Sequence, residues 1–78
     1  MDFLITRDGK PMMLVEAKVS DTRPDRNLIY FKNALEVDLA FQVVLESNSV
    51  RQVAPGVFVL DLASFMTLKE WEHKKSLP

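Results

Sequence analysis

The sequence predicts a single small α/β domain with a mixed β-sheet and two helices, in the order β-β-α-β-β-α. Its length of 78 residues suits one domain. A hydrophobic content of 47% with 27% charged residues is typical of a globular chain. Short apolar runs alternate with stretches of helical periodicity, which favours strands and helices in one fold.

The first two strands are predicted at residues 2–7 and 11–19, joined by a turn at Asp8-Gly9-Lys10. Both runs are rich in Phe, Ile, Leu and Val, the residues that favour strands. The second run is almost continuously apolar, so we expect a central strand that is covered on both faces. Pro11 suits the start of that strand, because proline lacks an N–H for the ladder.

The first helix is predicted at residues 24–37, after a polar loop at residues 20–23. Pro24 fits the first helical turn, and Asp25 there favours the helix dipole. The apolar face repeats at spacings of three and four, through Leu28, Phe31 and Leu35. We therefore expect an amphipathic helix that packs against the sheet.

The rest of the chain predicts short strands and a terminal helix. Residues 41–45 and 57–60 are apolar runs of strand length, and residues 50–53 fit a brief strand. Serines around Asn48 and the Pro55-Gly56 pair mark turns. The last helix is predicted at residues 61–74, with Asp61 or Ser64 as its N-cap.

Two charged residues stand out in the second strand. Glu16 and Lys18 are two positions apart, so they share one face of a strand whose other residues are mostly apolar. Charged side chains are seldom buried unless they are paired or bind a metal ion. This pair is therefore the first candidate for a functional site.

The length of the first turn decides whether Asp2 joins this pair. A three-residue loop, Asp8 to Lys10, places Asp2 opposite Glu16, whereas a two-residue loop places Asp2 opposite Val15. A shift of one residue also turns every side chain to the other face. We expect the three-residue loop, which brings the two carboxylates and the lysine together.

Asp2, Glu16 and Lys18 resemble the active centre of the PD-(D/E)xK nuclease superfamily, in which an aspartate on one strand precedes Glu-x-Lys on the next. Over most of its length the chain is similar to the DUF4143 domain, the C-terminal domain of a family of prokaryotic AAA-type ATPases. The residues that carry this resemblance are Asp2-Phe3-Leu4-Ile5, Gly9, Val15-Glu16-Ala17-Lys18 and Ser20.

The resemblance implies a partial restriction-endonuclease-like fold, with residues 1–78 as the distal half of a nuclease-like domain. It implies Asp2 and Glu16 as ligands of Mg²⁺ or Mn²⁺, with the Ala17 carbonyl as a third ligand. Lys18 is then the catalytic lysine. Ser20 and Arg23, just beyond the strand, are the expected phosphate contacts. The helix and strand that open the superfamily core are not matched, so a truncated or degenerate enzyme is one expectation.

A non-catalytic role is the alternative. Glu16–Lys18 or Asp2–Lys18 is then an ion pair at the end of a sheet, and the domain serves dimerisation or protein interaction. An uncovered edge strand is a template for pairing, so we expect a homodimer joined through strands or through the last helix. An ATPase is the other partner that the resemblance implies. The chain itself has no Gly-x-x-x-x-Gly-Lys-Ser/Thr phosphate loop.

Composition narrows the remaining possibilities. There is no cysteine, which excludes disulfides and thiolate metal sites and fits a cytoplasmic protein. The net charge of −1 gives no general attraction for nucleic acid, so such a contact would have to be local. We see neither a signal peptide nor an apolar run of membrane-spanning length. His73 is expected to be solvated, and Trp71 to anchor a partner or close the core.

Overall fold

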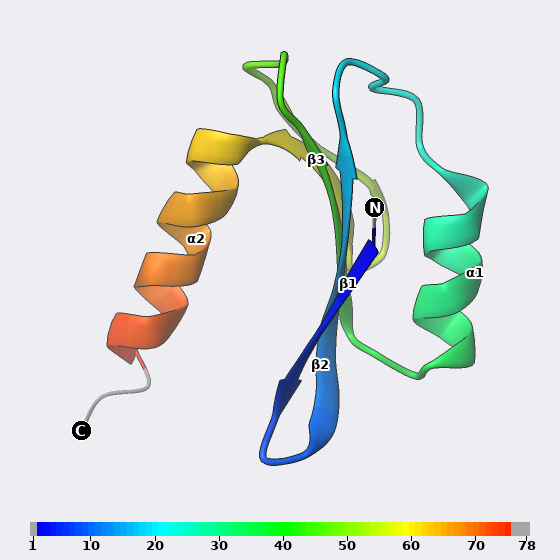
Figure 1. Cartoon of the computed structure of the whole chain (residues 1–78), viewed down its shortest axis with the longest axis vertical. Coiled ribbons are helices and arrows are strands. Elements are labelled where there is room, and N and C mark those ends of the chain that lie inside the picture. Colours follow the sequence, from blue (N-terminus) through cyan, green and yellow to red (C-terminus); the bar gives the residue numbers. More distant parts are fainter. Residues whose placement is uncertain (1, 76–78) are drawn as a thin grey trace.

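The computed structural model describes the backbone from Asp2 to Lys75 and the side chains from Phe3 to Leu68. It is a five-stranded sheet with one helix on each face, as Figure 1 shows with the sheet seen nearly edge-on. The predicted α/β class, the mixed sheet and the two helices are confirmed. The elements are β1 (Asp2–Arg7), β2 (Lys10–Lys18), α1 (Arg26–Ala34), β3 (Leu39–Val44), β4 (Val50–Ala54), β5 (Val57–Asp61) and α2 (Leu62–Lys75).

The strands lie in the order β1-β2-β3-β5-β4. The three inner strands β2, β3 and β5 run parallel, and each edge strand pairs antiparallel with its neighbour. The observed element order is therefore β-β-α-β-β-β-α, and the predicted order was wrong by one strand. The strand that the predicted order left out is β4, where residues 50–53 were expected to fit a brief strand. Its first three residues are exposed, so its hydrophobic pattern is weak.

Two apolar clusters fill the two sides of the sheet. On the α2 side lie Met13, Val15, Phe41, Val43, Leu60 and Phe65, and on the α1 side lie Leu14, Leu28, Val37, Ala40 and Val57. Four consecutive residues of β2, Met13 to Glu16, are buried, because alternate side chains enter opposite clusters. This confirms the prediction that β2 is covered on both faces.

The β1–β2 hairpin reaches the expected register by a different route. Arg7 pairs with Lys10, so the loop has two residues and the predicted three-residue loop was wrong. Asp8 and Gly9 both have positive φ, 53° and 77°, as a two-residue type I′ turn requires. The register then shifts by one residue, and Met12 has no partner on β1. This bulge restores the pairing of Asp2 with Glu16.

Helix α1 is shorter than the predicted range of residues 24–37, for reasons visible at both ends. Asp25 is its N-cap, with a side-chain oxygen that accepts the Asn27 N–H at 2.8 Å, so Pro24 lies outside the helix. At the other end Glu36 has φ 55°, and Val37 N–H donates to the Lys32 carbonyl at 3.2 Å. This bond and the positive φ of Glu36 are those of a Schellman motif that lacks the usual glycine. The sequence therefore does not signal where the helix ends.

Helix α2 begins directly after β5. Asp61 caps it by accepting the Ser64 N–H at 3.1 Å and the Ser64 hydroxyl at 2.6 Å, which confirms Asp61 as the predicted cap. Trp71 and His73 fall outside the described side chains. Neither α1 nor α2, as far as the described residues extend, combines the length and the apolar character that a membrane crossing needs.

Candidate functional site

The candidate residues Asp2 and Glu16 lie in one of the rows of register partners that cross all five strands. Asp2 on β1 pairs with Glu16 on β2, Glu16 with Gln42 on β3, and Gln42 with Val59 on β5. Val59 in turn pairs with Arg51 on β4. Register partners share a face of the sheet, and in β2 this face alternates with the α2-side positions Met13 and Val15. Four of the five positions in the row are therefore polar residues on the α1 side.

Glu16 and Lys18 are paired on this face, as their spacing predicts. Lys18 Nζ lies 3.3 Å from Glu16 Oε1, and the two side chains are 29% and 11% exposed. A carboxylate this far from water requires a charged or hydrogen-bonding neighbour, and the lysine supplies one. Asp2 is placed by its backbone opposite Glu16, while its side chain lies outside the described part of the chain.

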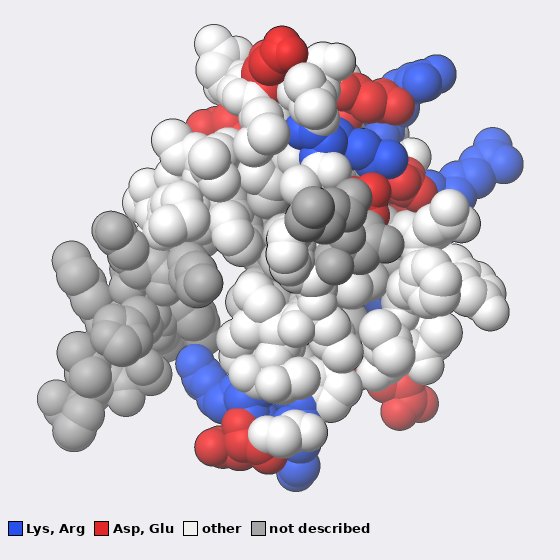
Figure 2. Space-filling model, in the orientation of Figure 1, with Lys and Arg blue, Asp and Glu red and all other residues white. Residues whose placement is uncertain are grey.

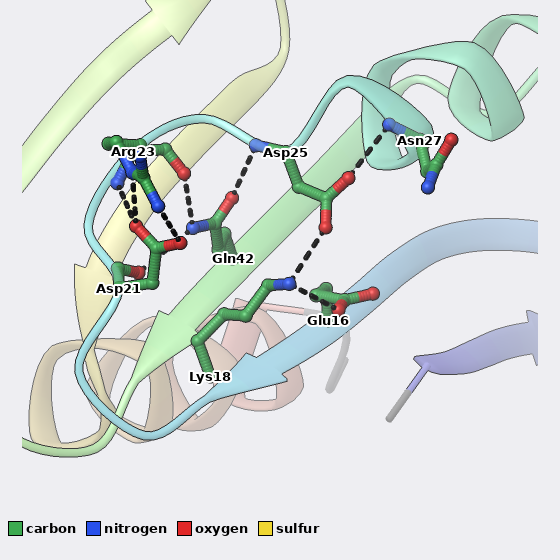
Figure 3. A network of polar contacts seen from close by, with 7 residues as sticks. All are labelled: Glu16, Lys18, Asp21, Arg23, Asp25, Asn27 and Gln42. Carbon is green, nitrogen blue, oxygen red and sulfur yellow. Dashed lines mark hydrogen bonds and ion pairs between the residues drawn. The ribbon is translucent and has the colours of Figure 1, made fainter.

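Asp25 is a further carboxylate at this site, although the sequence indicated only a role in the helix dipole. Its Oδ2 lies 2.9 Å from Lys18 Nζ, and its other oxygen caps α1 (Figure 3). The hydrogen bond from Lys18, followed by the one from the Asn27 N–H, lowers the pKa of Asp25 below its ordinary value. The Lys18 ammonium thus lies between two carboxylates, those of Glu16 and Asp25.

Gln42 is the second residue of this site that no sequence motif indicates. It is fully buried, and its amide holds the segment that joins β2 to α1. Its Oε1 accepts the Asp25 N–H at 2.9 Å, and its Nε2 donates to the carbonyls of Asp21 at 3.1 Å and Arg23 at 2.8 Å (Figure 3). The only signal in the sequence is one amide within the apolar run Leu39–Val44.

Arg23 and Ser20, the expected phosphate contacts, have different surroundings. Arg23 is bound to Asp21 through Nε at 3.1 Å and Nη2 at 3.2 Å, and its side chain is 87% exposed. The hydrogen bonds from Arg23 lower the pKa of Asp21 to about 2. Ser20 is exposed just after β2. Arg51, at the far end of the polar row, donates from Nη2 to the Thr22 carbonyl of the same loop.

A pocket of about 380 Å³ lies beside the Lys18 ammonium. It is lined by Lys18, Asp21, Arg23, Pro24, Asp25 and Arg26. Figure 2 shows basic and acidic side chains intermingled at this end of the molecule, with a largely uncharged band between it and the hairpin end. The structure thus brings Lys18 and Arg23 to one pocket, whereas Ser20 does not line it.

The described side chains of this site include carboxylates but no complete set of metal ligands. Among them, no group of three or more His, Cys, Asp or Glu residues is placed to hold a metal ion. Glu16 offers hard oxygen ligands of the kind that Mg²⁺ and Mn²⁺ prefer. Asp2 is opposite it in the ladder, and the position of the Lys18 ammonium between two carboxylates shows that the surroundings favour positive charge.

Comparisons of the chain with known protein families, with curated proteins and with solved structures found no match.

Proposed function

We propose that this chain is a metal-dependent phosphodiesterase domain of the nuclease-like type. In this proposal Asp2 and Glu16 hold Mg²⁺ or Mn²⁺, and Lys18 is the catalytic cation. The observation that carries the proposal is the pairing of Asp2 with Glu16 while Lys18 Nζ lies 3.3 Å from Glu16 Oε1. The resemblance of these three residues to the PD-(D/E)xK and DUF4143 domains supports the same assignment.

The divalent ion, when bound, would lower the pKa of a water ligand and screen negative charge on the phosphate. The residues of this chain have separate tasks. Glu16 supplies oxygen ligands, and the Ala17 carbonyl is a third candidate ligand on the same strand. Lys18 stabilises the charge that develops on the phosphate when water attacks phosphorus and the bond to the leaving oxygen breaks. Arg23 lines the adjacent pocket and is suited to contact a neighbouring phosphate.

The first test is a calorimetric titration of Mn²⁺ into the wild-type chain and into Glu16→Gln. Saturable binding that is lost in this variant is the expected result. The control is Glu36→Gln, which changes an exposed glutamate at the end of α1 and should bind like the wild type. Absence of saturable binding to the wild type would reject the metal site.

The second test measures hydrolysis of an oligonucleotide and of bis(p-nitrophenyl) phosphate with Mn²⁺. Lys18→Met should abolish any activity while retaining ion binding, because it removes a positive charge and no ligand. Lys10→Met, at the hairpin end of the molecule, is the matched control. Equal activity in the two variants would exclude Lys18 as the catalytic cation.

A second candidate function is protein association, and the edge strand β1 favours it. Phe3 and Leu4 are 48% and 44% exposed on a strand that pairs on one side only within the described residues. Exposed apolar residues beside unpaired backbone groups favour addition of another strand. The occupant would be a second copy of this chain or, as the DUF4143 resemblance implies, an ATPase.

A further inference from the structure

We infer that Asp25 and Gln42 are positioning residues that fix the Lys18 ammonium, Asp25 by direct contact and Gln42 by holding Asp25. The inference rests on the proposed function, because it assigns these residues a role in the chemistry of the same site. Its geometric part, the placement of Lys18, can be measured without metal or substrate.

The Asp25 carboxylate is fixed at both of its oxygens. One oxygen accepts the Asn27 N–H at 2.8 Å and so belongs to the first turn of α1. The other lies 2.9 Å from Lys18 Nζ. A lysine ammonium is a point charge on a flexible four-carbon stem, so its position depends on what its end contacts. Asp25 provides a contact that is itself anchored to a helix.

Gln42 fixes the backbone from which Asp25 extends. Both bonds from its Nε2 and the bond to its Oε1 end on three residues of the loop between β2 and α1: Asp21, Arg23 and Asp25. The side chain is fully buried, so water does not compete for these bonds. The central strand β3 therefore holds the loop at the height of Glu16, which is the register partner of Gln42.

Fixing a lysine in this way matters for phosphodiester chemistry. A charge stabilises a transition state most when it is already in place and needs no reorganisation. Small displacements of catalytic groups have large kinetic effects, on the order of 100-fold for about 1 Å. Glu16, the proposed metal ligand, is the register partner of Gln42, which holds the loop that positions Lys18.

The test compares Asp25→Asn with Asp61→Asn in the full chain. Asparagine is as good an N-cap as aspartate, so both helices keep their caps. Both variants also lose one cap carboxylate, but only Asp25 contacts Lys18. The NMR order parameter of the Lys18 side-chain ammonium should fall in Asp25→Asn and stay at the wild-type value in Asp61→Asn. Urea unfolding, measured in parallel, reports any general loss of stability.

A second variant tests the indirect step. Gln42→Leu should also lower the Lys18 order parameter, although Gln42 is not the residue that contacts the ammonium. An unchanged order parameter in Asp25→Asn, or an equal fall in Asp61→Asn, would overturn the inference.

The kinetic arm uses hydrolysis of bis(p-nitrophenyl) phosphate with Mn²⁺. Asp25→Asn should lower kcat by roughly 10- to 100-fold and leave KM and Mn²⁺ affinity within about twofold. A change confined to KM would contradict positioning of the lysine. If the wild type neither binds Mn²⁺ nor hydrolyses substrate, the proposed function fails, and the order parameters alone decide whether Asp25 and Gln42 position Lys18.

Discussion

Asp2 and Glu16 are direct register partners although the hairpin between their strands has only two loop residues. The two-residue turn by itself would place Val15 opposite Asp2. Met12, the residue without a partner on β1, supplies the compensating shift. The turn and the bulge therefore act together, and Asp2 and Glu16 are register partners only because both are present.

The two glycines should differ in their tolerance of a side chain. Gly9 has φ 77° and open space where a Cβ would lie, so Gly9→Ala meets only backbone strain and should cost about 1 kcal/mol of unfolding free energy. Gly56 has φ 71°, and a Cβ there would overlap the Asp38 carbonyl oxygen. Gly56→Ala should therefore cost clearly more, about 3 kcal/mol. Urea unfolding measures both, and equal losses would contradict the close approach at Gly56.

Loss of the buried amide should destabilise the fold. Gln42→Leu leaves the Asp25 N–H and the carbonyls of Asp21 and Arg23 without their partner, which should cost about 2–4 kcal/mol. The control is Gln52→Leu on β4, where an exposed amide donates to the Ala54 carbonyl at 3.2 Å. That variant should change stability by less than about 0.5 kcal/mol. Similar losses of unfolding free energy in the two variants would contradict a stabilising role for the hydrogen bonds of Gln42.

The Asp21–Arg23 pair predicts a pH dependence with a definite sign. The pKa of Asp21 is lowered to about 2 in the folded chain, against an ordinary value of 3.8, because Arg23 donates to its charged form. The unfolded chain binds this proton first, so the stabilisation is complete above pH 3.8 and is lost as pH falls toward 2. Carboxyl NMR titration should show the low midpoint, and Arg23→Gln should raise it toward 3.8. A midpoint that Arg23→Gln does not move would exclude Arg23 as the cause.

The edge strand β1 should govern self-association. Leu4→Lys places a charge on an exposed position of this edge and should abolish any dimer seen by light scattering, with little effect on unfolding. Val50→Lys is the matched change on the opposite edge strand β4, where Val50 is 56% exposed. A dimer that only Val50→Lys disrupts would place the interface at β4. A wild type that stays monomeric at all concentrations would exclude association through either edge.

Much of the fold is predictable from the sequence because hydrophobic spacing reports burial directly. The continuous apolar run of β2 indicated coverage on both faces, and the helix periodicity located α1. Of the apolar face expected for that helix, however, Leu28 is buried while Phe31 and Leu35 are exposed. The strand β4 was the hardest element to predict, since an exposed edge strand needs few apolar residues. The end of α1 was misplaced because Glu36 adopts positive φ, a conformation that glycine usually signals.

The candidate site was predictable only at the positions where charged residues interrupt an apolar strand. Glu16 and Lys18 stand out for that reason, and alternation places them on one face. Asp25 could not be assigned to the site from the sequence. No local sequence pattern indicates that the loop after β2 folds back and brings Asp25 next to Lys18. Gln42 was visible as a lone amide in β3, but its partners are backbone groups, which leave no trace in a sequence.

The burial of β2 on both faces gives Glu16 a second role, in the specification of the fold. A slip of β2 by one residue would turn Glu16 and Lys18 together, away from Gln42 and Asp25 and into the aromatic cluster around Phe41 and Phe65. Transfer of charged groups into an aromatic cluster carries a large desolvation penalty, whereas an exchange of Val, Leu and Met between the two faces costs little. Glu16, the proposed metal ligand, therefore also disfavours the alternative register of β2.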